Sequence, residues 1–222
     1  MVIDKISLTK LSFKKSTMVF CLLVIFLLIG LYIRIYHLNF PSIGYHNMKE
    51  NEYLDQAYFF MTEGNLLHKQ SFAFFGLNEG TGYHEEYAEV PYVSYLTAAA
   101  WTLFGQSLWL PRLFMIFFML GSILLTYFIV KRLTKNEYLA LLSSFLMTIM
   151  PLGIYFGRNI QPESPGLFFI LLTAFFFIKW LDTNENKNLM YSGFAFSVAW
   201  GLKYSFGIIA VPLFFMLPFK EI

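Results

Sequence analysis

Charged residues and cysteine are both scarce in this sequence. Asp, Glu, Lys and Arg make up 14% of the 222 residues, whereas soluble domains carry about 25% charged residues. The single cysteine, Cys21, lies inside an apolar run, so a disulfide within one chain is excluded and no thiolate–histidine pair is indicated. The net charge of +2 gives no electrostatic reason to expect a nucleic-acid partner.

Motifs of nucleotide-binding enzymes and of serine hydrolases are also missing. The sequence has no Walker-type loop, no GxGxxG and no GxSxG. Apolar side chains are abundant instead: 57% of the residues are hydrophobic, 20% are aromatic, and 27 are Phe. This surplus exceeds what one soluble core buries and is typical of a protein in a lipid bilayer. We therefore predict an all-α fold, a polytopic transmembrane helical bundle in the cell membrane.

The first predicted span covers residues 17–36. Thr17–Ile35 is almost entirely apolar and long enough to cross a hydrocarbon core of about 30 Å. It is too long for the apolar part of a typical signal peptide, and no small-residue cleavage site follows it, so we interpret it as a signal anchor. Four lysines and one aspartate precede it, and the positive-inside rule therefore places the N-terminus in the cytoplasm.

Residues 37–107 are predicted to form an extracytoplasmic loop with juxtamembrane helices. Asn47 followed by Glu50 is a variant of the capping box that starts helices. The apolar spacing after it predicts an amphipathic helix on the membrane surface that ends at Gly64. Residues 64–89 contain several glycines and no clear period, which indicates a loop.

Residues 90–104 are apolar but too short for a typical span. If this segment crossed the membrane, the three cations within 131–135 would lie outside. If it lies at the interface, they remain in the cytoplasm, as the positive-inside rule favours. The rest of the bundle, residues 108–219, then follows by alternation. Its predicted spans are 108–130, 138–156, 166–181 and two short segments of 189–219 that turn near Lys203.

The acidic segment from His46 to Glu89 is the first candidate for chemistry. It holds eight of the fourteen carboxylates of the chain: Glu50, Glu52, Asp55, Glu63, Glu79, Glu85, Glu86 and Glu89. Those at the start of the predicted helix can supply a general base, or they can bind a divalent metal together with Glu163 and a histidine. The residues alone leave both roles open. Further metal candidates are His46, His84, Glu85 and Glu86. Their spacing is not of the HExxH type, and we expect them to be solvated.

The predicted topology brings further charges to the same outer face. Arg158 and Glu163 lie in a hairpin that is more polar than a simple connection requires. Lys203 lies near the middle of an apolar run, and an intramembrane charge is functional by default, so we predict that it contacts an anionic headgroup. Arg34 and Arg112 flank spans at the outer boundary, where we expect them mainly to anchor lipid headgroups.

Five short motifs follow one another along the chain. They are KENEYLDQA at 49–57, VPYVSYLTAAAWTLFG from Val90, LPRL around Arg112, GRNIQPE at 157–163 and WGLK at Lys203. In this order they resemble the GT-C superfamily of membrane glycosyltransferases, most closely the protein O-mannosyltransferase and lipid A aminoarabinose transferase types. The resemblance covers most of residues 17–219 and implies a GT-C-like transmembrane domain. We expect residues 1–222 to be the N-terminal piece of a longer enzyme.

The resemblance implies transfer of a sugar from a polyprenyl-phosphate donor to a lipid, glycan or protein acceptor on the extracytoplasmic side. The expected catalytic carboxylates are Glu50 and Glu163. The cations expected to bind the donor phosphate are Lys49, Arg158 and Lys203. Further residues expected to line the site are Glu52, Asp55, His46 and Arg112. A divalent metal is a candidate cofactor, and whether the reaction requires one stays open.

Three positions depart from the family motifs. Lys49 stands where the first motif has Asp, Glu163 replaces the Asp of the hairpin, and Val90 replaces the first Pro of the interfacial helix. Glu50 is the acid that remains of the first pair. Two other functions stay open: a transporter or channel fragment, which the gathering of charges at one face disfavours, and a non-catalytic assembly subunit, which would tolerate loss of Glu50 and Glu163.

Overall fold

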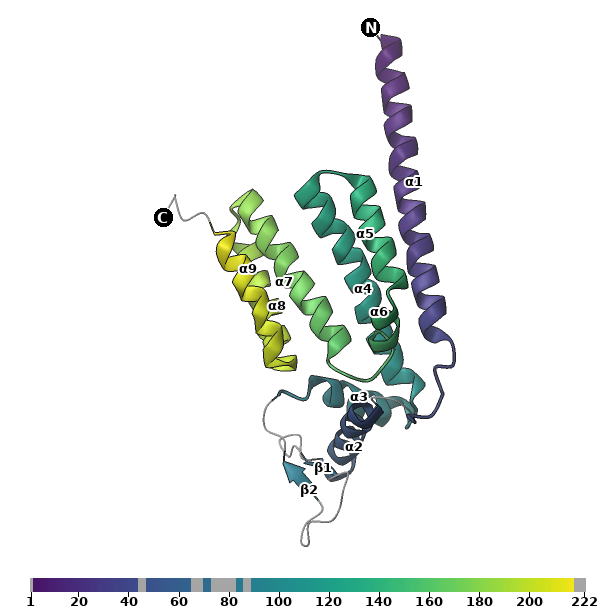
Figure 1. Cartoon of the computed structure of the whole chain (residues 1–222), viewed down its shortest axis with the longest axis vertical. Helices are drawn as coiled ribbons and strands as arrows, with labels where there is room; N and C mark the ends of the chain where they lie inside the picture. Colours follow the sequence, from purple (N-terminus) through teal and green to yellow (C-terminus); the bar gives the residue numbers. More distant parts are fainter. Residues whose placement is uncertain (1, 44–46, 65–69, 73–82, 86–88, 218–222) are drawn as a thin grey trace.

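The computed structural model describes residues 2–43, 47–64, 70–72, 83–85 and 89–217. Within these ranges the chain is a bundle of helices with one small two-stranded ribbon (Figure 1). The elements are α1 (Val2–Ile35), α2 (Asn47–Glu63), β1 (Gln70–Phe72), β2 (Tyr83–Glu85), α3 (Tyr92–Phe104), α4 (Trp109–Thr134), α5 (Glu137–Ile149), α6 (Pro151–Phe156), α7 (Glu163–Thr183), α8 (Asn186–Leu202), η1 (Tyr204–Ile209) and α9 (Ala210–Phe215). This architecture confirms the predicted helical membrane bundle.

Three helices in the described part of the chain are long and apolar enough to cross a membrane. They are Thr17–Ile35 within α1, the whole of α4 and the whole of α7. Large apolar side chains such as Phe20, Leu28 and Phe117 are exposed on them. Apolar residues on all sides of a helix indicate surroundings of lipid rather than water. The chain is therefore an integral membrane protein.

The helices alternate in direction, so the bundle has two distinct ends (Figure 1). α4 packs between α5 and α7, α8 packs on α7, and α1 packs against α4 and α5. The turns α4–α5 and α7–α8 lie at one end (Figure 1). The α6–α7 hairpin and the break between α8 and η1 lie at the other, which we call the site end.

Helices α2 and α3 lie across the site end rather than along the bundle (Figure 1). Phe60 and Trp101 are buried between them, and the Ser94 hydroxyl of α3 donates to the side-chain oxygen of Gln56 on α2 at 2.7 Å. α3 has 13 residues and is therefore about 20 Å long, shorter than a hydrocarbon core of about 30 Å. Its length and its crosswise position agree with an interfacial helix.

The span predicted over 138–156 is not one continuous helix, because the structure breaks it into α5 and α6. Pro151 begins α6, and Met150 before it has φ −59° and ψ 122°, outside the helical region. Proline has no N–H to donate, and its ring disfavours a helical conformation in the preceding residue. The break leaves carbonyl oxygens at the end of α5 without helical donors.

Two further details concern connections. The loop predicted over 64–89 contains β1 and β2, which pair antiparallel with Gln70 opposite Glu85. Strands of three residues are too short for an alternating pattern to be visible in the sequence. The turn predicted near Lys203 is present, because Lys203 is extended, with φ −163° and ψ 123°, between α8 and η1.

Candidate functional site

Glu50 is a buried carboxylate at the site end of the bundle. It lies in the first turn of α2 and is 1% exposed. Arg112 of α4 donates from Nε to Oε1 and from Nη2 to Oε2, each at 3.0 Å. The Ser42 hydroxyl donates to Oε2 at 2.7 Å, and the backbone N–H of Ile160 donates to Oε1 at 3.2 Å. Glu50 therefore connects α2, α4, the segment after α1 and the α6–α7 hairpin.

These four donors decide the charge state of Glu50. Burial is the largest influence and by itself raises the pKa of the carboxyl. The hydrogen bonds from Arg112 and Ser42, the charge of Arg112 and the N–H of Ile160 outweigh it and hold the pKa of Glu50 below its ordinary value. A carboxylate has about four acceptor sites, and the four donors occupy them. Glu50 is thus ionised and saturated, a geometry that does not favour the general base expected from the sequence.

Arg112 points into the protein rather than to lipid headgroups. It is 4% exposed. Beyond its contact with Glu50, Nη1 donates to the carbonyl oxygens of Leu38 and Phe40 at 2.7 and 2.6 Å. The expectation that Arg112 anchors headgroups is therefore wrong. Its guanidinium instead fastens the segment that follows α1 to α4.

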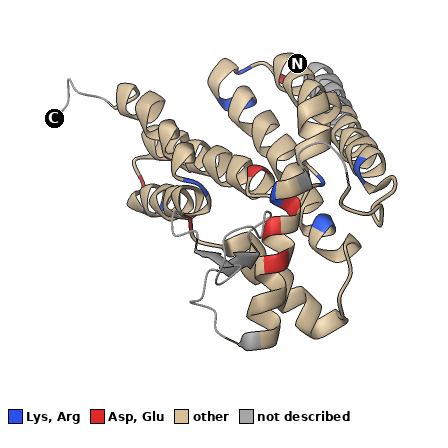
Figure 2. Cartoon of the chain, turned by 60° about the horizontal axis from the view of Figure 1, so that its bottom comes forward, with Lys and Arg blue, Asp and Glu red and all other residues tan. Residues whose placement is uncertain are grey.

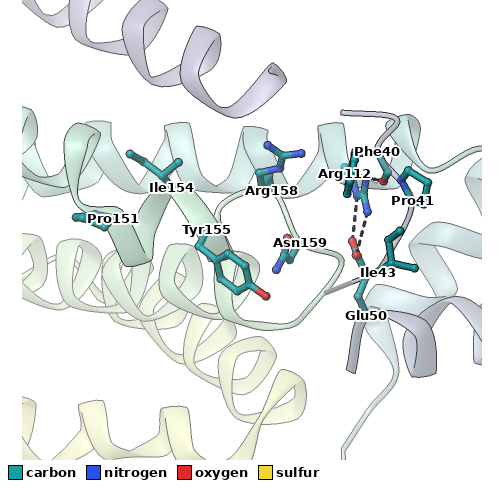
Figure 3. A pocket seen from close by; sticks show the side chains of 10 residues that line it. All are labelled: Phe40, Pro41, Ile43, Glu50, Arg112, Pro151, Ile154, Tyr155, Arg158 and Asn159. Carbon is teal, nitrogen blue, oxygen red and sulfur yellow. Dashed lines mark hydrogen bonds and ion pairs between the residues drawn. The ribbon is translucent and has the colours of Figure 1, made fainter. Parts of the chain in front are cut away.

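A cavity of about 540 Å³ lies beside the Glu50–Arg112 pair (Figure 3). Its walls come from the segment after α1, from α2, α4 and α6, and from the hairpin. They are formed by Phe40, Pro41, Ile43, Glu50, Arg112, Pro151, Ile154, Tyr155, Arg158 and Asn159. Acidic and basic residues meet at this end of the bundle (Figure 2). A few polar groups on largely apolar walls, in a volume of this size, are typical of a ligand site.

Arg158 brings to the cavity a positive charge that no acidic residue in the described ranges pairs with. Its Nη1 and Nη2 donate to the carbonyl oxygens of Tyr36 and His37 at 2.7 and 2.9 Å. No acidic residue in the described ranges forms an ion pair with it. Partial burial lowers the pKa of Arg158, the charge of Arg112 lowers it further, and Glu50 opposes both. Because Arg112 neutralises Glu50, the charge of Arg158 remains available to an anion.

Asn159 is a cavity residue that the sequence analysis missed. It is 7% exposed, and its Nδ2 is buried without a hydrogen-bond partner in the described part of the chain. A buried polar group without a partner costs about 1–3 kcal/mol. A lone Asn in a polar hairpin looks like an ordinary turn residue, so the sequence carried no signal for it.

Glu163 and Lys203 form a second polar cluster at the site end. Lys203 Nζ donates to Glu163 Oε1 at 3.0 Å, while Oε2 of Glu163 is buried and has no partner among the described residues. The pair does not contribute to the cavity walls. Glu163 follows Ile160 by three positions, so their Cα atoms lie at most about 11 Å apart. The structure thus places Glu50, Arg112 and Arg158 on the cavity wall. Glu163 lies near it at the end of the hairpin, and Lys203 pairs with Glu163 from the break between α8 and η1.

Arg34 is completely buried, with 0% exposure. Its Nη1 donates to the carbonyl oxygens of Gly30 and Thr148 at 3.0 and 3.2 Å, and its Nε and Nη2 donate to that of Gly153 at 3.3 and 3.1 Å. Thr148 and Gly153 lie on either side of the α5–α6 break. The expectation that Arg34 anchors headgroups is wrong, because its buried guanidinium bridges the break: it donates to the Thr148 carbonyl at the end of α5 and to the Gly153 carbonyl of α6.

The other expected site residues do not contribute to the cavity walls. Lys49 is exposed on α2, and Glu52 and Asp55 are half-buried there. Burial raises the pKa of Asp55. His46 lies outside the described residues.

The described ranges hold no group of three or more His, Cys, Asp or Glu that could bind a metal ion. Of the further metal candidates, His84 and Glu85 belong to β2, and Glu86 lies outside the described residues. Glu50, the central acid of the proposed metal set, is occupied by its four hydrogen-bond donors. The side chains that the structure describes therefore give no support to a metal site.

Comparison with known proteins gives one match. Residues 88–221 match the model of a family described as dolichyl-phosphate-mannose-protein mannosyltransferase. The matched range includes α3–α9 and thus Arg112, Arg158, Asn159, Glu163 and Lys203. No curated protein and no solved structure matches the chain.

Proposed function

The chain belongs to the dolichyl-phosphate-mannose-protein mannosyltransferase family, and from this premise we propose that it moves a sugar from a polyprenyl-phosphate donor to an acceptor on the extracytoplasmic face. Family membership and the candidate spans identify a membrane glycosyltransferase of the mannosyltransferase type. The donor, the side of the membrane and the acceptor, a lipid, glycan or protein, are our proposal. The observation that carries it is the cavity at the site end, where the charge of Arg158, which has no ion-pair partner among the described residues, meets apolar walls.

The reaction requires three things of the protein. A hydroxyl oxygen of the acceptor forms a bond to the anomeric carbon of the sugar, and the bond from that carbon to the phosphate oxygen breaks. The electron pair leaves with the polyprenyl phosphate, and the hydroxyl proton must go to a base. A site therefore needs a base, a cation for the departing phosphate and an apolar surface for the prenyl chain.

Arg158 is the proposed cation for the phosphate. Two backbone carbonyls hold its guanidinium in position, so little conformational entropy is lost when an anion binds. Pro151 and Ile154 provide an apolar wall on α6, which is suited to the first units of the prenyl chain. The Glu50–Arg112 pair fixes the hairpin relative to α2 and α4 and contributes no net charge.

Glu163 is the proposed base. Lys203 holds its Oε1 and thereby orients the carboxylate, while Oε2 has no partner among the described residues and can accept the hydroxyl proton. Glu50, the first candidate from the sequence, has no acceptor site left. We therefore assign Glu50 a positioning role. Because Lys203 pairs with Glu163, we assign it to the base as its partner rather than to the phosphate.

The test is release of polyprenyl phosphate from a mannosyl-phosphoryl polyprenol by membranes that contain the full chain. Glu163→Gln is expected to lower the rate by about 10²–10⁴-fold, as for loss of a general base. Glu185→Gln is the matched control, because Glu185 also pairs with a lysine, at 3.2 Å, but at the opposite end of the bundle. It should react as the wild type does.

The outcomes separate the parts of the proposal. An unchanged rate in folded Glu163→Gln would remove Glu163 as the base but leave the donor assignment intact. If the folded wild type releases no more polyprenyl phosphate than membranes that lack the protein, the donor assignment is contradicted. An assembly subunit would then be the better explanation.

A further inference from the structure

The side-chain nitrogen of Asn159, Nδ2, lacks a hydrogen-bond partner in the part of the chain that the structure describes. Its Nδ2 is buried, and the residue lies on the cavity wall between Tyr155 and the Glu50–Arg112 pair (Figure 3). Buried polar groups in native proteins are almost always hydrogen-bonded, so each exception requires a physical explanation. Since this amide borders a cavity, a bound ligand is an explanation that the site itself provides.

The backbone holds Asn159 firmly in this position. The preceding residue, Arg158, is fixed by its two bonds to carbonyl oxygens. The following residue, Ile160, donates its N–H to Glu50, and the carbonyl of Asn159 accepts from the N–H of Gln161 at 2.9 Å. The amide is therefore pre-organised, which favours binding because little freedom is lost.

The chemistry of the neighbouring groups restricts the ligand. An amide N–H donates and cannot coordinate a cation, and a purely apolar ligand would leave it unsatisfied. Arg158 provides donors and one positive charge that no described acid neutralises. The ligand that satisfies both groups carries negatively charged or hydroxyl oxygens.

We propose that Asn159 contacts the glycosyl-phosphate headgroup of the donor, its amide donating a hydrogen bond to a phosphate or sugar oxygen while Arg158 meets the charge. This inference rests on the proposed function and adds to it a residue that binds the donor. Among the described residues of the free protein Nδ2 has no partner, and in the complex it gains one. Asn159 thus contributes to affinity for the donor without contributing to the stability of the free protein.

The experiment measures binding of three probes to the purified full chain: a short-chain polyprenyl phosphate, its mannosyl phosphodiester, and the uncharged polyprenol. Asn159→Ala is expected to weaken binding of at least one phosphate probe about tenfold or more. Asn159→Asp should weaken it further, because the new carboxylate repels the phosphate. The matched controls are Asn186→Ala and Asn186→Asp, at an exposed position at the opposite end of the bundle, which should bind all probes as the wild type does.

Thermal unfolding without ligand separates binding from structure. If Asn159 only binds ligand, Asn159→Ala unfolds at the same temperature as the wild type or higher, whereas a structural residue would lower it. Weakened binding of both phosphate probes places the amide on the phosphate, and weakened binding of the mannosyl probe alone places it on the sugar. If wild type and Asn159→Ala bind the phosphate probes equally, the role of Asn159 is overturned while the proposed function stands. A wild type that binds all three probes equally overturns the inference and the proposed function together.

Discussion

Arg112 and Glu50 lie 62 positions apart in the chain, and one edge of the guanidinium meets both carboxylate oxygens at 3.0 Å. Two-point contacts of this kind fix direction as well as distance. Because Arg112 also holds two carbonyls after α1 and Glu50 also holds the hairpin, the pair sets the shape of the cavity. Several variants test this arrangement and the fold around it.

Glu50→Gln should lower the free energy of unfolding by about 3–5 kcal/mol, because it leaves the buried Arg112 without its counter-charge. Glu137→Gln is the control. Glu137 pairs with Lys131 at 3.0 Å with both side chains partly exposed, and such pairs contribute about 0–1 kcal/mol. Unfolding of both variants in the same detergent compares the two effects, and equal losses would contradict a special role for Glu50.

The effect of Glu50→Gln should also depend on pH. The pKa of Glu50 is lowered in the folded protein, so its stabilising contribution is present above the unfolded pKa of about 4.3 and is lost as the pH falls through the folded value. We expect the difference in stability between wild type and Glu50→Gln to be constant from about pH 5 to 8 and to shrink in more acidic solution. A difference that shrank as the pH rose would contradict this assignment.

Arg34→Met should destabilise the protein by about 1–3 kcal/mol, because the buried carbonyl of Thr148 loses the donor that Arg34 supplies. Arg34→Lys should recover only part of the loss, since an ammonium group cannot reproduce the fork of donors. Arg132→Met is the control, because Arg132 pairs with Asp182 where both are partly exposed. Thermal unfolding that ranked Arg132→Met as the more damaging change would argue against the role of Arg34.

Gly166→Ala should destabilise the protein by about 1–3 kcal/mol through overpacking. A Cβ there would clash with the Phe206 ring, which packs directly against Gly166 in α7. Gly193→Ala is the matched change within α8, where no atom lies within 4 Å of the new Cβ. It should stabilise by about 0.5–1 kcal/mol through helix propensity. Unfolding of the two variants should therefore shift in opposite directions.

The two ends of the bundle should face opposite sides of the membrane. In a Cys21→Ser background, Met48→Cys on α2 and Asn186→Cys at the start of α8 place single thiols at exposed positions of opposite ends. An impermeant thiol reagent should label Met48→Cys in intact cells and Asn186→Cys only after permeabilisation. Labelling of both in intact cells would overturn the predicted topology.

The spans could be predicted from the sequence because crossing a bilayer depends on local properties, namely length and apolarity. Thr17–Ile35, α4 and α7 satisfy both conditions on their own residues. The α5–α6 break also had a local signal in Pro151, but the continuous apolar character of residues 138–156 concealed it. The three-residue strands β1 and β2 had no local signal in the sequence.

The site could be predicted only in part. The sequence indicated that Glu50, Arg158 and Glu163 matter, since charges are conspicuous in an apolar chain. It could not indicate that Arg112 forms hydrogen bonds to both carboxylate oxygens of Glu50, or that Lys203 pairs with Glu163. Those contacts depend on how segments far apart in the sequence pack together. Asn159 had no signal, since its missing hydrogen-bond partner is a property of the folded cavity.

The guanidinium of Arg34 gives α1 a role in biogenesis. Chains emerge N-terminus first, so α1 enters the membrane before the α5–α6 break has been synthesised. During that interval Arg34, one residue from the end of the helix, can extend toward the interfacial water. It becomes buried when Thr148 and Gly153 present their carbonyls to it. A different apolar helix without an arginine at this turn would leave the Thr148 carbonyl without its donor, so we expect the exchange of α1 for such a helix to destabilise the α5–α6 break.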